Sequence, residues 1–339
     1  MKKINYFIIA IVVMFITSCT NNQVKLSAAG ATFPLPYYNL AFSTYNELNN
    51  INITYGGIGS GGGIRSLKDK VVNFAGSDAY LSDAELAKMP SQVLHIPTCM
   101  GAVVMAFNLD NIDNINITSQ IISDIYHGKI TNWNDKEIEA INPDITLPNL
   151  EITPVYRSDG SGTTFVFSDY MTKTSEDWNN DFGHGKSLKW KLGIASKGNP
   201  GVAGVIKQTK GAIGYIGSEY AFAQDIKMAA VQNPNGEFIK ANAKSISLAA
   251  SGDIRADTRQ MITASTAKGS YPISCFTWII FYKDLSISCK DEKTQTETLK
   301  LLNWMLSDKA QELTLKVNYV PLPQKAINAG LEILSTVNK

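Results

Sequence analysis

The 339-residue sequence predicts an α/β protein built on mainly parallel sheets. Strand-like apolar runs alternate with helix-like segments, an order that is typical of parallel strands joined by crossover helices. In addition, several apolar runs lead directly into turns of glycine and hydroxyl residues that open a helix. We find no internal repeat and no low-complexity tract.

The spacing of apolar residues places these elements along the chain. Short apolar runs predict strands at 51–55, 72–76, 94–97, 103–107, 152–156, 212–216 and 277–282. Residues at helical spacing predict helices at 36–48, 61–71, 82–88, 119–126, 136–141, 296–306, 308–316 and 324–334, and one that begins at Ser161.

The N-terminus has the features of an export signal. Lys2 and Lys3 precede an apolar run over 6–16, which is shorter than the roughly 20 residues that a membrane-spanning helix needs. The run ends in Ile16-Thr-Ser-Cys19, which resembles the cleavage box of bacterial lipoproteins. We therefore expect a signal peptide over 1–18, lipidation of Cys19, and a membrane-anchored protein in the periplasm or on the cell surface. A plain signal peptide or a short membrane anchor is the alternative.

The charge balance excludes a strongly basic surface. The leader holds two of the 31 basic residues and none of the 30 acidic ones, so the mature chain has 29 against 30. This balance, without a basic stripe or an aromatic–basic platform, argues against nucleic acid as a partner. An anion would have to be held by local donors. With 44% hydrophobic residues, the chain can supply two domain cores.

The strongest local signal is Arg157-Ser-Asp-Gly-Ser-Gly-Thr-Thr164, which follows a predicted strand and opens a predicted helix. The first turn of a helix presents unpaired N–H groups and a partial positive charge, so it attracts anions. Arg157 can grip an oxyanion with two parallel hydrogen bonds, and Asp159 is placed to orient it. An ordinary capped helix is the alternative for this motif alone.

Two further segments have the same character. Gly56-Gly-Ile-Gly-Ser-Gly-Gly-Gly63 connects a predicted strand to a predicted helix, a position that favours a close-approach turn over a flexible linker. In Ala29-Gly-Ala-Thr-Phe-Pro34, Thr32 can cap a helix. The early prolines of that helix stand in its first turn, where a missing N–H removes no helical hydrogen bond. Three such helix starts suggest one anion held from several sides.

Cysteine and histidine residues indicate no further chemistry. Beyond Cys19 there are three cysteines, at 99, 275 and 289; two of them could form a disulfide, but the sequence does not indicate which. The three histidines lie apart from one another and from acidic clusters, so we expect no metal site and no cofactor.

Together these motifs resemble the phosphate-binding protein of the bacterial high-affinity phosphate ABC transporter. The matching segments lie in that family's order and cover nearly the whole mature chain: Ala29–Pro34, Gly57–Gly62, Asn73–Ala79, Asp124–Ile130, Arg157–Thr163, Gly211–Tyr215 and Tyr271–Ile273. Gly61 departs from the family pattern, because relatives often carry a second serine at this position. The three later cysteines are also not part of the family pattern.

The resemblance implies a two-lobed periplasmic-binding-protein fold of type II, in which each lobe is a mainly parallel sheet flanked by helices and the ligand lies in the cleft between them. Aligning the motifs places the crossings near 99–104 and 272–277. Lobe I would then combine 26–102 with 275–339, and lobe II would span 103–274.

The resemblance also implies a monomeric binding protein, not an enzyme, that captures inorganic phosphate and delivers it to ABC permease subunits. The family's phosphate-binding residues carry over to Thr32, Phe33, Ser60, Asp78, Arg157, Asp159, Ser161, Gly162 and Thr163. Phe33 would donate through its backbone, and Asp78 would accept a hydrogen bond from a protonated ligand oxygen. Alternatively, Asp78 could cap the helix that begins near Ser82 or stabilise the turn before it.

Other functions are less well supported. Another oxyanion, sulfate or molybdate, is the alternative ligand. A secreted phosphatase needs a metal or a nucleophile with its base, and the sequence shows neither. Gly57-Ile-Gly-Ser-Gly-Gly62 satisfies the dinucleotide-binding pattern, but an exported protein is an improbable dinucleotide enzyme. Neither Ser60 nor Ser161 stands in the elbow motif of a serine hydrolase.

Overall fold

A computed structural model describes residues 23–338, so the expected signal peptide and Cys19 lie outside the described residues. The strands are β1 (Lys25–Gly30), β2 (Asn52–Gly57), β3 (Phe74–Ser77), β4 (Val93–Phe107), β5 (Asn116–Ile117), β6 (Thr153–Arg157), β7 (Ile194–Ser196), β8 (Ala212–Gly217), β9 (Lys227–Met228), β10 (Ala230–Gln232), β11 (Phe238–Ile239) and β12 (Ser274–Tyr282).

The helices follow the strands in the alternating order that the sequence predicts. They are α1 (Leu35–Asn49), α2 (Ser60–Lys68), α3 (Asp83–Leu86), α4 (Ser119–His127), α5 (Lys136–Ala140), α6 (Gly162–Thr174), α7 (Glu176–Asp181), α8 (Gly198–Gln208), α9 (Ser218–Gln224), α10 (Ala243–Ala249), α11 (Glu292–Met305), α12 (Asp308–Leu315) and α13 (Gln324–Ser335), with a 3₁₀ turn at Leu285–Ile287.

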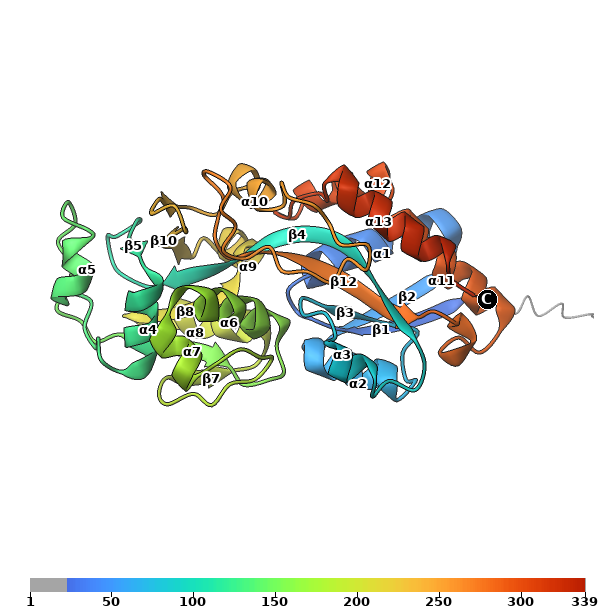
Figure 1. The fold of residues 1–339 in the computed structure, drawn as a ribbon, viewed down its shortest axis with the longest axis horizontal. Helices are drawn as coiled ribbons and strands as arrows, with labels where there is room; N and C mark the ends of the chain where they lie inside the picture. The colour runs from blue at the N-terminus through green and yellow to red at the C-terminus, as the bar shows by residue number, and fades with distance from the viewer. Residues whose placement is uncertain (1–22, 339) are drawn as a thin grey trace, which may run out of the picture.

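One large sheet, in the order β2-β1-β3-β12-β4-β8-β6-β7, runs through the molecule. The long strand β4 pairs with β12 as far as Ala102 and with β8 from Val103 onward. Figure 1 shows β4 and β12 passing between two groups of elements. We call the group around β1, β2 and β3 the first half, and the group around β6, β7 and β8 the second half. The predicted domain boundaries remain a prediction.

Within each half, the outer strands are parallel, so their carboxyl ends lie at one edge. In the first half, Gly30 at the end of β1 is in register with Gly57 of β2 and Gly76 of β3. In the second half, Arg157 at the end of β6 is in register with Ser196 of β7. Ligands of open α/β sheets bind outside the carboxyl ends of such strands. The loops that leave β1, β2, β3 and β6 are the ones that the sequence motifs single out, whereas no motif marks the loop after β7.

The predicted α/β class is confirmed, and so are most of the expected elements, with two corrections. The strands expected at 94–97 and 103–107 are one strand, β4, because the buried residues between them stay extended and pair with β12. The helix expected from 296 begins at Glu292, because the Asp291 side chain caps it by accepting from the Thr294 N–H. Helices α7 to α10 were not expected.

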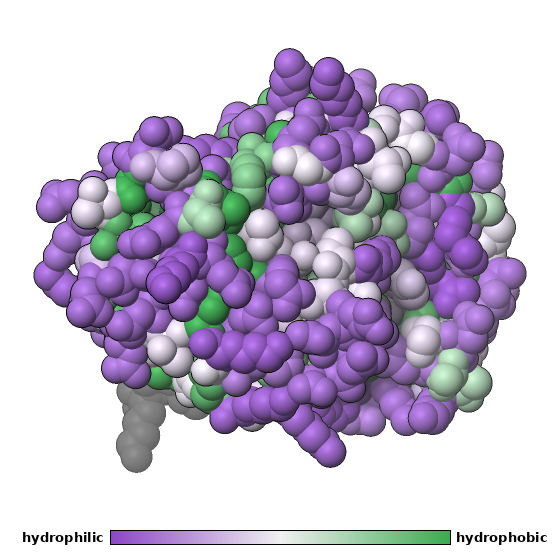
Figure 2. Space-filling view, turned by 60° about the vertical axis from the view of Figure 1, so that its left-hand side comes forward, coloured by the Kyte–Doolittle hydropathy of each residue, from purple (hydrophilic) through white to green (hydrophobic). Residues whose placement is uncertain are grey.

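The three cysteines of the described residues lie in the core as free thiols. Cys99, Cys275 and Cys289 are all buried and unpaired, so none of the disulfides that the sequence allows is formed. The face in Figure 2 is mainly hydrophilic, with apolar residues in small separate groups. No helix within residues 23–338 is both long and apolar enough to cross a membrane.

Gly63 in α2 lies where the helix touches the end of β1. A methyl group added there would be 2.4 Å from the Gly30 Cα and 2.5 Å from the Ala29 carbonyl oxygen, so the helix would have to shift. We expect Gly63→Ala to lower the free energy of unfolding by about 1–3 kcal/mol or more. Gly204, inside α8 with nothing within 4 Å of an added methyl group, is the matched control.

We expect Gly204→Ala to raise the free energy of unfolding by up to about 1 kcal/mol, because alanine loses less backbone entropy in a helix. Denaturant unfolding of the two variants measures both effects. Equal effects of the two substitutions would show that the contact of α2 with β1 does not constrain Gly63.

Candidate anion-binding site

The first half contributes three of the predicted residues from three loops at one sheet edge. Thr32 follows β1, Ser60 is the first residue of α2, and Asp78 follows β3. All three are buried, with exposed fractions of 5%, 0% and 1%. The Ser60 Oγ accepts a hydrogen bond from the Asp78 N–H at 3.4 Å. The Gly59 before α2 has a φ of +84°, a left-handed conformation that suits glycine.

Two of the roles considered for these residues are wrong. Thr32 does not cap α1, because Pro34 stands at the N-cap, and the Thr32 Oγ1 accepts a hydrogen bond from the Asn199 N–H instead. Asp78 does not cap α3, because Ser82 caps it in a capping box with Glu85. Both Thr32 and Asp78 are therefore left to face the site.

The second half contributes a charged pair and a helix start. The Arg157 Nε and Nη2 donate to the two carboxylate oxygens of Asp159, at 2.7 and 2.5 Å. The Arg157 side chain is only 1% exposed, so the pair is largely shielded from water. Ser161 caps α6 by accepting from the Thr164 N–H, which leaves the Ser161 hydroxyl proton free. Gly162 and Thr163 form the first turn, whose N–H groups have no earlier carbonyl to bind.

Backbone contacts join the two halves at the site. The Gly61 N–H donates to the Gly160 carbonyl oxygen at 2.9 Å. A methyl group added at Gly162 would lie 2.4 Å from the Ser60 Oγ and 2.6 Å from the Asp78 Oδ2. The Tyr220 hydroxyl donates to the Thr32 carbonyl oxygen at 2.5 Å. The structure thus brings the predicted residues of both halves around one buried point.

The electrostatics of the site centre on two acidic side chains. Burial raises the pKa of Asp159, but the hydrogen bonds and charge of Arg157 and the N–H of Gly198 lower it further, so the net pKa lies below its usual value. Burial raises the pKa of Asp78 to about 7, although hydrogen bonding from Thr277 and the charge of Arg157 oppose this rise. Asp159 is therefore held ionised, whereas Asp78 is poised to exchange a proton near neutral pH.

Asp78 has one satisfied and one unsatisfied oxygen. The Thr277 hydroxyl donates to its Oδ1 at 2.7 Å, while its Oδ2 is buried without any hydrogen-bond partner. A buried carboxylate oxygen without a donor is costly. This oxygen, which lies beside Gly162 at the start of α6, is placed to accept a hydrogen bond from a ligand.

Sequence reasoning missed Asn199 and Thr277. Asn199 is fully buried in the first turn of α8 and donates from its Nδ2 to the Oγ1 atoms of Thr32 and Thr163, at 3.2 and 3.1 Å. The glycine-containing run Gly198-Asn-Pro-Gly201 at the start of a helix was a usable signal, since it repeats the pattern of the other helix starts. Thr277 lies inside the apolar strand β12, where nothing in the local sequence marks it.

The arrangement suits a small oxyanion that carries a proton. It combines hydroxyl groups, the N–H groups at the start of α6 and a guanidinium with the unpartnered Oδ2 of Asp78. Among residues 23–338, no group of three or more His, Cys, Asp or Glu side chains could hold a metal ion.

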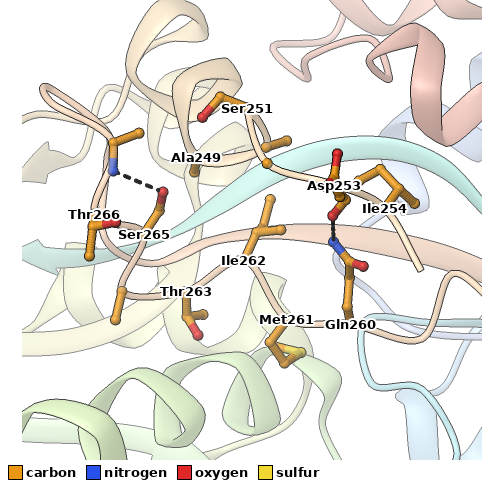
Figure 3. A pocket seen from close by; sticks show the side chains of 14 residues that line it. Ala249, Ser251, Asp253, Ile254, Gln260, Met261, Ile262, Thr263, Ser265 and Thr266 are labelled. Carbon is orange, nitrogen blue, oxygen red and sulfur yellow. Dashed lines mark hydrogen bonds between the residues drawn. The ribbon is translucent and has the colours of Figure 1, made fainter.

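A separate pocket of about 460 Å³ lies between the end of α10 and the chain that leads to β12 (Figure 3). It is lined by small, polar and apolar residues, and its only charged side chain is Asp253. Lys325 pairs with that carboxylate at 2.9 Å. The pocket therefore has no cationic side chain in its lining, whereas the buried cluster contains Arg157, and the buried cluster is the candidate site.

Comparison with known proteins shows the family to which this arrangement of two halves belongs. A family model described as a PBP superfamily domain matches residues 17–309. Proteins named phosphate-binding protein PstS are similar throughout: that of Xylella fastidiosa is 37% identical over 310 residues, 90% of this chain and 83% of the relative. That of Haemophilus influenzae is 33% identical over 335 residues, 97% and 96% of the two chains. The chain therefore belongs to the phosphate-binding protein family within the PBP superfamily.

Solved structures share the fold. A phosphate-bound, high-affinity periplasmic phosphate-binding protein named PfluDING aligns with a TM-score of 0.74 over 93% of this chain and 99% of its own, at 19% identity. A putative phosphate ABC transporter substrate-binding protein from Clostridium perfringens, with bound phosphate, aligns with a TM-score of 0.64 over 88% and 100%, at 18% identity. The two-lobed class expected from the resemblance is confirmed.

The raised pKa of Asp78 predicts a pH dependence of stability without ligand. Between about pH 4 and 7 the folded protein keeps a proton on Asp78 that the unfolded chain has lost, so stability falls as the pH rises through this window. In Asp78→Asn this contribution is absent, and we expect a smaller fall. Denaturant unfolding at a series of pH values, in buffers free of oxyanions, measures the difference between the two proteins. Parallel curves would show that the pKa of Asp78 is not raised in the folded protein.

Proposed function

We propose that this protein captures inorganic phosphate outside the cytoplasm and delivers it to an ABC-type permease. The observation that carries the proposal is the single unpartnered oxygen of Asp78 among donors from both halves of the molecule. A phosphate ion fits this set, because near neutral pH it has oxygens for the donors and at least one proton for Asp78. The names of the PstS relatives support the same ligand.

The nine residues expected from the sequence form the proposed site. Arg157, held by Asp159, donates from its two remaining N–H groups to the ligand, while Thr32, Ser60, Ser161 and Thr163 donate through hydroxyls. The backbone N–H groups of Phe33, Gly162 and Thr163 add donors. Sulfate and molybdate, the alternative oxyanions, lack a proton for Asp78 near neutral pH.

The protein is proposed to act as a monomeric, non-enzymatic carrier held to the membrane by a lipid on Cys19. Its lobes are proposed as 26–102 with 275–339 and as 103–274, so that the halves open by movement about β4 and β12.

The function and the role of Arg157 are tested together by calorimetric titration. We expect the wild-type protein to bind phosphate far more tightly than sulfate or molybdate. Arg157→Ala should weaken phosphate binding by roughly tenfold or more, because charge-assisted hydrogen bonds are lost. Lys136→Ala, on the exposed start of α5, is the charge-matched control and should leave the affinity unchanged. Stronger binding of sulfate or molybdate than of phosphate would refute the proposed ligand.

Asp78 is expected to discriminate phosphate from sulfate. Above about pH 7, where Asp78 is ionised, sulfate would face an unpaired acceptor and a repelling charge, and sites that depend on a ligand's hydrogen bond reject analogues that lack it. Asp78→Asn should retain phosphate binding, because an amide can donate and accept, while sulfate affinity rises. The ratio of the two dissociation constants is the readout. An unchanged ratio in a folded variant would remove Asp78 from this role.

Lipidation is expected to depend on Cys19. Because the box Ile16–Cys19 ends in the modified cysteine, Cys19→Ser should abolish attachment of lipid and leave a protein that keeps its leader or is released. Metabolic labelling with palmitate, followed by fractionation, measures both. Variant protein labelled as strongly as the wild type would show that the box is incidental.

A further inference from the structure

Asn199 occupies a central place in the site without being one of its expected donors. It is fully buried, and its side-chain amide lies between the Thr32 hydroxyl of the first half and the Thr163 hydroxyl of the second. Gly217 fixes the orientation of this amide, because its N–H donates to the Asn199 Oδ1 at 3.1 Å. Since a backbone N–H can only donate, the amide nitrogen must point to the two threonines.

Each threonine hydroxyl has one proton and two lone pairs. The Thr32 Oγ1 accepts from both the backbone N–H and the Nδ2 of Asn199, at 3.0 and 3.2 Å. Both of its acceptor positions are therefore taken by one residue.

Both acceptor positions of the Thr163 Oγ1 are also taken, in this case by two different residues. It accepts from the Arg157 Nη1 at 3.2 Å and from the Asn199 Nδ2 at 3.1 Å. Within residues 23–338, neither threonine hydroxyl donates its own proton to a protein acceptor. Each hydroxyl can thus act toward a ligand only as a donor.

We propose that Asn199 is a positioning residue that makes Thr32 and Thr163 obligate hydrogen-bond donors to the bound anion. The proposal rests on the proposed function and deepens it. It explains why these hydroxyl groups, which could donate or accept a hydrogen bond, act toward the ligand only as donors. With both threonines so oriented, Asp78 is left as the acceptor for the proton of the ligand.

A mutant cycle tests this proposal by calorimetric titration with inorganic phosphate. Asn199→Ala should weaken phosphate binding by roughly tenfold or more, since two hydroxyls become free to turn away from the ligand. In a Thr32→Val/Thr163→Val background, which has no hydroxyls to orient, the same substitution should cost less than about twofold. An equal loss in both backgrounds would overturn the proposal, because a merely structural role does not depend on the hydroxyls.

Two further variants keep the test decisive. Asn199→Leu removes the amide donor and acceptor without adding a charge, so its cycle against the valine background gives the same information if the alanine variant does not fold. Asn142, a buried asparagine that binds only backbone groups near α5, is the matched control, and Asn142→Ala should leave the phosphate affinity unchanged.

The outcomes separate the inference from the function on which it rests. Wild-type protein that does not bind phosphate would overturn both. Wild-type protein that binds phosphate, with effects of Asn199→Ala that are independent of the threonine hydroxyls, would overturn the inference alone. Coupling of Asn199 to the hydroxyls, with Asn142→Ala unchanged, supports it.

Discussion

The hydrogen-bonding capacity of a buried anion is the constraint on which the rest of the structure depends. An ion removed from water must have its oxygens paired with donors and its proton paired with an acceptor, or the lost hydration is not recovered. In the proposed site, buried hydroxyls, helix starts and Arg157 would supply donors, and the Asp78 Oδ2, which is buried without a partner, would supply an acceptor. The near-neutral charge of the chain makes such local pairing necessary, because no diffuse basic field is present to do the same.

The fold supplies the geometry that this constraint demands. Parallel strands end at one edge, so loops that are far apart in sequence meet there, and the loop after β6 opens α6, whose first-turn N–H groups have no earlier carbonyl to bind. The glycines of these loops permit the contact. Gly61 and Gly160 touch through their backbones, and Gly162 leaves space for the Ser60 hydroxyl and the Asp78 carboxylate.

Much of this could be predicted from the sequence, because local patterns encode it. The alternation of apolar runs predicts the α/β class, and the Arg157–Thr163 motif predicts a strand end, a charged pair and a helix start, which the structure contains. What could not be predicted depends on contacts between distant segments. Thr32 could be expected to cap its own helix because the competing partner, Asn199, lies 167 residues further along the chain. Thr277 gives no local signal, since its role exists only where β12 passes behind Asp78.

Asp78 is proposed to accept the proton of a phosphate ion that is otherwise surrounded by donors. A crystal structure of the protein with phosphate, grown near pH 7, tests this most directly. The account predicts one phosphate oxygen within about 2.5–3.0 Å of the Asp78 Oδ2, the distance of a hydrogen bond between two oxygens. It also predicts that Arg157 and the start of α6 contact the other oxygens. A phosphate ion that binds elsewhere, or one that leaves the Asp78 Oδ2 bonded to water instead, would contradict the account.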